Sequence, residues 1–88
     1  MANPSPSETL LTELALVLRQ TREEAGLSKR ELAQRAGCIT TTITRLESGV
    51  QNPGLELLTR ISFALHTQPS HLLARAESRV NLKSEEVT

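Results

Sequence analysis

Side chains able to act as nucleophiles, general acids or metal ligands are few in this sequence. It has one cysteine, Cys38, two histidines, His66 and His71, and no aspartate. These three residues do not have the spacing of a zinc site. No glycine-rich phosphate loop is present, and no Ser–His or Cys–His pair has an orienting acid. We therefore expect no enzyme activity, no metal and no cofactor, and we interpret Cys38 as a small apolar residue of the core.

A run of polar β-branched residues, TTTIT at 40–44, precedes Arg45. Composition alone leaves open whether such a polar face has a function or is merely solvated. Propensity alone favours a strand, because each threonine costs up to roughly 0.7 kcal/mol in a helix relative to alanine. Ile43 and Leu46 are nevertheless three residues apart, Gly49 is placed to end a helix, and no partner strand is evident. The spacing therefore predicts a helix that ends at Gly49.

The elements before this run are also predicted to be helices. Apolar residues at helical spacing indicate a first helix over roughly Thr9–Ala25, which Gly26 ends. Ser28 and Glu31 form a capping box that begins a second helix, and Gly37 ends it after about two turns.

The elements after the run follow the same pattern. The turn residues 52–54 precede a fourth helix, whose apolar stripe is Leu55, Leu58, Ile61 and Leu65. Pro69 begins a last short helix that runs to about Glu77. Residues 1–8 predict a flexible arm, residues 9–77 a single domain, and residues 78–88 a tail without assigned structure.

Length and composition agree with a small helical domain. The chain has 88 residues, many of them leucine and alanine, and a single aromatic residue, Phe63. Ten basic residues balance ten acidic ones, which excludes a polybasic tail that binds by charge alone. No long apolar run or signal peptide is evident, so we expect a soluble, cytoplasmic protein. A domain this short is marginal alone, which favours oligomerisation.

Leu14 to Leu73 resembles the Cro/XRE-type, lambda-repressor-like helix-turn-helix family. The resemblance rests on several features in order: Gly26-Leu27-Ser28, Glu31-Leu32-Ala33, Ala36-Gly37, Ile43-x-Arg45-Leu46-Glu47-x-Gly49, Asn52-Pro53 and Leu72-Leu73. It implies an all-α, compact five-helix DNA-binding domain with the helix-turn-helix at helices 2 and 3. The third helix would then lie in the major groove.

The resemblance also implies roles for individual residues. Base-reading positions fall on Thr40, Thr41, Thr44 and Arg45, with Ile39 near them. Arginine can bind guanine bidentately, and threonine offers a hydroxyl to bases and a methyl group to thymine. Phosphate-binding positions fall on Ser28, Lys29, Gln51 and Asn52. Arg22 and Glu47 match positions that form a structural ion pair, although two solvated charges are the alternative.

Three positions depart from the family pattern, and one of them is Gly54 at the cap of the fourth helix. Ile39 stands where a serine or threonine usually caps the third helix, so the cap is expected to fall to Thr40. His66 replaces the glycine that usually follows the fourth helix.

The most favoured function is a repressor or autoregulating controller that binds a palindromic operator in double-stranded DNA as a homodimer. Phe63 and Val17 are apolar where the family is usually polar, which predicts a dimer interface there; the alternative is that Phe63 folds into its own core. The rival function is a helical protein-interaction adaptor or antitoxin module of the same fold. A pure adaptor would carry carboxylates or large apolar residues where this chain has threonine and arginine.

Overall fold

Five helices make up the regular structure of the computed structural model, which describes the backbone of residues 3–87 and the side chains of residues 3–82. In chain order they are α1 (Pro6–Glu24), α2 (Lys29–Ala36), α3 (Thr40–Glu47), α4 (Leu55–Ala64) and α5 (Pro69–Val87). The described residues contain no strand. The all-α, five-helix class predicted from the sequence is therefore confirmed.

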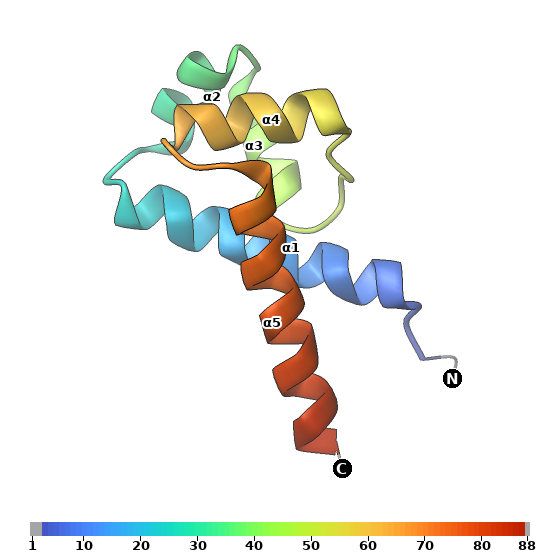
Figure 1. Cartoon of the computed structure of the whole chain (residues 1–88). Coiled ribbons are helices and arrows are strands. Elements are labelled where there is room, and N and C mark those ends of the chain that lie inside the picture. Colours follow the sequence, from blue (N-terminus) through green and yellow to red (C-terminus); the bar gives the residue numbers. More distant parts are fainter. Residues whose placement is uncertain (1–2, 88) are drawn as a thin grey trace.

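α1 crosses the molecule and contacts α3 and α5 (Figure 1). α5 packs on α1, crosses it steeply and also contacts α4. α2 contacts both α3 and α4. Within the described part of the chain, no helix combines the length and apolar content needed to span a membrane.

The core forms where the apolar stripes of these helices meet. Its most deeply buried apolar side chains are at most 2% exposed: Val17, Leu18, Leu32, Ala33, Ile43, Leu46, Ile61, Leu72 and Ala76. Ile43 and Leu46 belong to the threonine-rich run, which is helical rather than extended. Burial of this apolar pair outweighs the local strand propensity of the threonines.

Residues at its two ends determine where α2 begins and ends. The Ser28 hydroxyl accepts from the Glu31 amide, and the Glu31 carboxylate accepts from the Ser28 amide, both at 3.0 Å. Gly37 follows α2 with φ +72°, in the left-handed region that favours glycine. Cys38 then packs half-buried against the core, and burial raises the pKa of its thiol.

α1 begins earlier than the sequence predicts. Residues 6–8, expected within a flexible arm, are its first turn. The Ser5 hydroxyl accepts from the Glu8 amide at 3.2 Å, and Pro6 occupies the first helical position, where a missing N–H costs no hydrogen bond. The proline and serine content of residues 1–8 predicted a flexible arm, but proline is compatible with the first position of a helix, which Pro6 occupies. Residues 1–2 of the expected arm lie outside the described residues.

α5 extends beyond its predicted end at Glu77, so the expected boundary between 77 and 78 falls inside this helix. One contact that helps to hold the extension is an ion pair in which Arg79 Nε donates to Glu13 Oε2 at 2.8 Å. The Glu13 side chain is 1% exposed. Because this pair joins residues far apart in the sequence, local periodicity gives no sign of it. Thr88 lies outside the described residues.

Candidate nucleic-acid interface

One face of α3 is polar and open to solvent. All four residues expected to read bases are exposed on it: Thr40, Thr41, Thr44 and Arg45. Ile43 and Leu46 hold the opposite face in the core, each 1% exposed. Within the described residues, the hydroxyls of these threonines and the Arg45 guanidinium have no hydrogen-bond or ion-pair partner. α3 therefore presents three hydroxyls and one guanidinium to solvent.

The first turn of α3 has no side-chain cap. Its N-cap residue is Ile39, and Thr40 is the first helical residue, so the expectation that Thr40 caps the helix is wrong. Ile39 has φ −92° and ψ 155°, an extended conformation that a β-branched residue adopts readily. The hydroxyl of Thr40 is consequently not used by the helix backbone.

The start of α2 offers a lysine beside a carboxylate. Lys29 is the first residue of α2 and is half-buried. The capping box occupies the amides of Ser28 and Glu31, which leaves those of Lys29 and Arg30 without a helix partner. The hydrogen bond from the Ser28 backbone lowers the pKa of Glu31, so a negative charge stands at this helix start. An anion binding here would depend on Lys29 to offset that charge.

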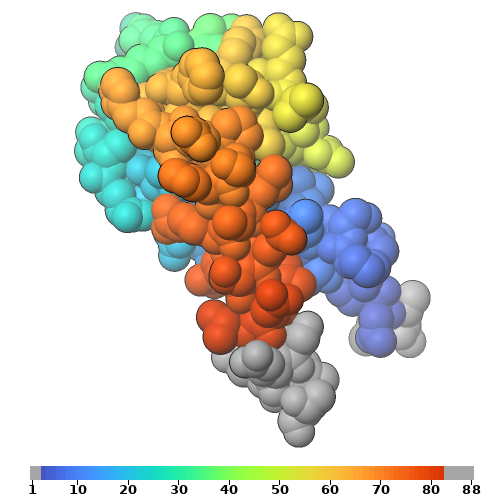
Figure 2. All heavy atoms as spheres, viewed as in Figure 1, coloured from blue at the N-terminus to red at the C-terminus, as the bar shows by residue number. Residues whose placement is uncertain are grey.

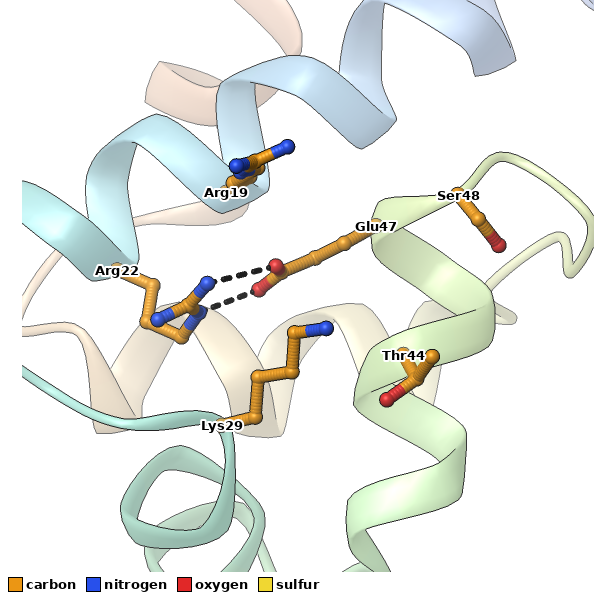
Figure 3. A pocket seen from close by; sticks show the side chains of 6 residues that line it. All are labelled: Arg19, Arg22, Lys29, Thr44, Glu47 and Ser48. Carbon is orange, nitrogen blue, oxygen red and sulfur yellow. Dashed lines mark hydrogen bonds and ion pairs between the residues drawn. The ribbon is translucent and has the colours of Figure 1, made fainter.

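α1, α2 and α3 surround a hollow of about 290 Å³. It is lined by Arg19, Arg22, Lys29, Thr44, Glu47 and Ser48. Figure 3 shows Lys29 reaching from the start of α2 into the space between α1 and α3. The hollow thus brings a residue of the expected phosphate-binding set, Lys29, next to one of the expected base-reading set, Thr44.

An ion pair inside this hollow joins α1 to α3. Arg22 Nε donates to Glu47 Oε2 at 2.7 Å, and Arg22 Nη2 donates to Glu47 Oε1 at 3.0 Å. A third bond runs from Arg22 Nη1 to the Leu27 carbonyl at 2.9 Å. The two side chains are only 11% and 5% exposed, and the bonds to Glu47 raise the pKa of Arg22. The pair is therefore a structural link rather than two solvated charges.

Arg19 is a residue of the hollow that the sequence analysis missed. It lies one turn before Arg22 on α1, and its contact with Glu23 is an exposed one at 3.6 Å. Because Arg22 is neutralised by Glu47, the cations of the hollow left for an outside anion are Arg19 and Lys29. The spacing of Arg19 and Arg22, three residues apart on one helix face, is the signal that would have found it.

Gln51 and Asn52 do not line the hollow that Lys29 lines. Gln51 is half-buried and Asn52 is exposed in the segment between α3 and α4. Asn52 lines a different hollow of about 180 Å³, together with apolar residues of α1 and α4. Lys29 and Asn52 therefore line two different hollows.

Phe63 and Val17 differ sharply in exposure. Phe63 is 67% exposed, so it does not fold into the core of its own chain. It borders a hollow of about 420 Å³ that also holds Arg35 and Arg60. Val17 is fully buried, so its predicted contact with a second chain is wrong. Because α1 packs against both α3 and α5, its buried face is wider than a single stripe.

Metal-binding residues do not gather in the described part of the chain. No group of three or more histidine, cysteine or acidic side chains there is arranged to hold a metal ion.

Comparisons of the sequence with known proteins give a consistent result. A family profile described as a helix-turn-helix domain matches residues 13–76. An uncharacterised transcriptional regulator of this type from Methanothermobacter thermautotrophicus is 45% identical over 49 residues, which are 56% of this chain and 71% of that protein. Another from Mycobacterium tuberculosis is 34% identical over 59 residues, or 67% of this chain but only 42% of the relative.

Two solved structures are similar over most of the chain. ClgR, the clp gene regulator of Corynebacterium glutamicum, has a TM-score of 0.84 and 28% identity, covering 94% of this chain and 86% of that one. The restriction-modification controller protein C.AhdI of Aeromonas hydrophila has a TM-score of 0.69 and 29% identity, covering 70% and 94%.

Proposed function

We propose that this protein binds a specific sequence of duplex DNA and regulates transcription there, because the chain belongs to the helix-turn-helix domain family of transcription regulators. One observation carries this proposal: α3 holds a polar, exposed face over a fully buried apolar one, and the turn at Gly37 attaches it to α2. A helix with this arrangement can enter the major groove while α2 crosses the DNA backbone.

The chemistry of the α3 face suits base edges. The Arg45 guanidinium can donate two hydrogen bonds to O6 and N7 of guanine. The hydroxyls of Thr40, Thr41 and Thr44 can donate to or accept from either kind of base pair. All four side chains are exposed, so no internal contact must break before they bind.

The hollow between α1, α2 and α3 suits a phosphate of the DNA backbone. Lys29 supplies the charge from the start of α2, with Ser28 beside it, and Arg19 supplies a second charge from α1. The Arg22–Glu47 pair holds α1 against α3, so a phosphate held there fixes the register of α3 in the groove. Gln51 and Asn52 would meet the backbone elsewhere, since they lie outside this hollow.

We further propose that the protein acts as a two-fold homodimer on a palindromic operator. Phe63 is a large exposed ring on α4, and burying it between subunits would contribute roughly 1.5–3 kcal/mol. The carboxyl end of α4 and the start of α5 adjoin on the face turned to the viewer in Figure 2. To read two half-sites of a palindrome, such a dimer would need its two α3 helices about 34 Å apart, one turn of DNA. Such a dimer would repress or autoregulate by occupying its site.

Selection of bound sites from random duplex DNA tests the proposal. We expect wild-type protein to enrich a sequence with two inverted half-sites. Arg75→Ala serves as the control, because it removes an exposed arginine of α5 that contacts Thr21 and Glu24 of α1 rather than a residue of α3. The control should enrich the same sequence. Failure of a folded wild-type protein to enrich any sequence would contradict DNA reading and favour a protein-interaction module.

A further inference from the structure

Ile39 is an apolar side chain that neither caps α3 nor packs in the core. It immediately precedes α3 and is 68% exposed, whereas its neighbour Cys38 packs against the core. The position is an N-cap, where serine, threonine, asparagine or aspartate stabilises a helix by about 1 kcal/mol relative to an apolar residue. Neither capping nor core packing therefore accounts for isoleucine at this position.

The neighbours of Ile39 define the surface to which it belongs. Thr40 and Thr41 follow it directly and are exposed, so the apolar side chain stands at the amino end of the polar face of α3. The amino end of a recognition helix is the part that penetrates the major groove most closely. An isoleucine at that point cannot hydrogen-bond a base, but it can exclude water from an apolar group.

We propose that Ile39 reads the C5-methyl group of one thymine in each half-site; this inference rests on the proposed DNA binding. The thymine methyl is the distinctive apolar group that base pairs display in the major groove. Contact with it would favour thymine over cytosine at one position without any hydrogen bond. A cytosine methylated at C5 carries the same group at the same place, so the contact would also accept 5-methylcytosine.

Replacement of thymine by uracil tests this contact, because the two bases differ in the methyl group alone. The probe is the DNA duplex selected by wild-type protein, with each thymine of one half-site replaced in turn by uracil. We expect wild-type affinity to fall about fourfold at one position, the effect of withdrawing one buried methyl group from contact. Cytosine placed at that position should bind about fourfold better when methylated at C5.

Variants of Ile39 assign the effect to this side chain. Ile39→Ala should bind the thymine and uracil duplexes equally at that position, while keeping the wild-type preference at all others. Ile39→Ser should give the same result, and because serine adds a helix cap, its fold is secured. Leu55→Ala is the matched control: Leu55 is 77% exposed at the start of α4, and its removal should leave the fourfold ratio unchanged.

The outcomes separate this inference from the proposed function. Wild-type protein that binds a selected duplex but is insensitive to uracil at every position would overturn the role of Ile39 alone. So would an Ile39→Ala protein that keeps the fourfold ratio. Wild-type protein that selects no duplex would instead overturn DNA reading itself.

Discussion

Arg45 combines exposure with a lack of internal partners, which makes it the strongest candidate for base recognition. We expect Arg45→Ala to lose about 1–3 kcal/mol of binding free energy per half-site and to relax the preference at one base pair. Binding to the selected operator and to single mismatches at each position measures both effects. An equal loss on all sequences would mean that Arg45 contacts only phosphate.

Lys29 is expected to contact phosphate, and its signature is a dependence on salt. Each phosphate contact contributes about 0.9 to the slope of log affinity against log salt concentration on duplex DNA. Lys29→Ala should flatten the slope by about that amount per subunit and leave sequence preference intact. Arg75→Ala controls for the loss of a positive charge and should keep the wild-type slope. A wild-type slope in Lys29→Ala would place this residue outside the interface.

At the scale of the element, the end of α4 contains a strained residue. His66 follows α4 with φ +56°, a left-handed conformation in which a side chain is disfavoured. We expect His66→Gly to raise the free energy of unfolding by about 0.5–1 kcal/mol, since relief of strain exceeds the extra flexibility of glycine in the unfolded chain. Urea denaturation measures the change.

Gly26 provides the matching test of the same principle. It follows α1 with φ +73°, and a Cβ added there would meet nothing within 4 Å. Gly26→Ala should therefore lower the free energy of unfolding by about 1 kcal/mol through the backbone alone. Gly26→Ala is expected to destabilise the protein and His66→Gly to stabilise it. If both variants destabilised it, the side chain of His66 would have a stabilising contact that outweighs its backbone strain.

How well the sequence predicts each element depends on the range of the interactions that determine it. The start of α2 depends on Ser28 and Glu31, and its end depends on Gly37. Because these residues lie at or next to the helix ends, both ends could be predicted from the local sequence. The extension of α5 involves Arg79 and the buried Glu13, which only the folded chain brings together. The burial of Val17 has the same origin, because two helices cover α1 and a single stripe describes only one contact.

The candidate site likewise has features that depend on the local sequence and features that depend on the folded chain. The exposure of the four α3 residues follows from the helical spacing of Ile43 and Leu46, which is visible in the sequence. The hollow between α1, α2 and α3 is visible only in three dimensions, because Arg19 and Thr44 lie on different helices.

At the scale of the whole molecule, most acidic side chains of residues 3–82 take part in internal contacts. Glu13 and Glu47 are buried in ion pairs, and the more exposed Glu24 pairs with Arg75 of α5. Lys29 and Arg45 have no such acidic partner among the described residues. A net charge of zero is therefore compatible with a locally basic surface at α2 and α3.

The proposed dimer predicts a defect in assembly when Phe63 becomes charged. Phe63→Lys should weaken association by about 1.5–3 kcal/mol per subunit, because the apolar burial is lost and two like charges approach the two-fold axis. Sedimentation at micromolar protein concentration measures this shift toward monomer. Phe63→Leu keeps an apolar side chain and should stay dimeric. A folded Phe63→Lys protein that remained fully dimeric would exclude the Phe63 interface.

The Arg22–Glu47 link has an evolutionary consequence. Removing one partner of a buried ion pair costs about 3–5 kcal/mol, and a protein of this length is typically stable by about 5–13 kcal/mol in total. A single substitution at either position would thus remove much of the free energy of unfolding. Simultaneous replacement of both residues by apolar ones need not lower it. The two codons are therefore coupled: lineages descended from this protein should retain both residues or exchange both together, with few surviving intermediates between the two states.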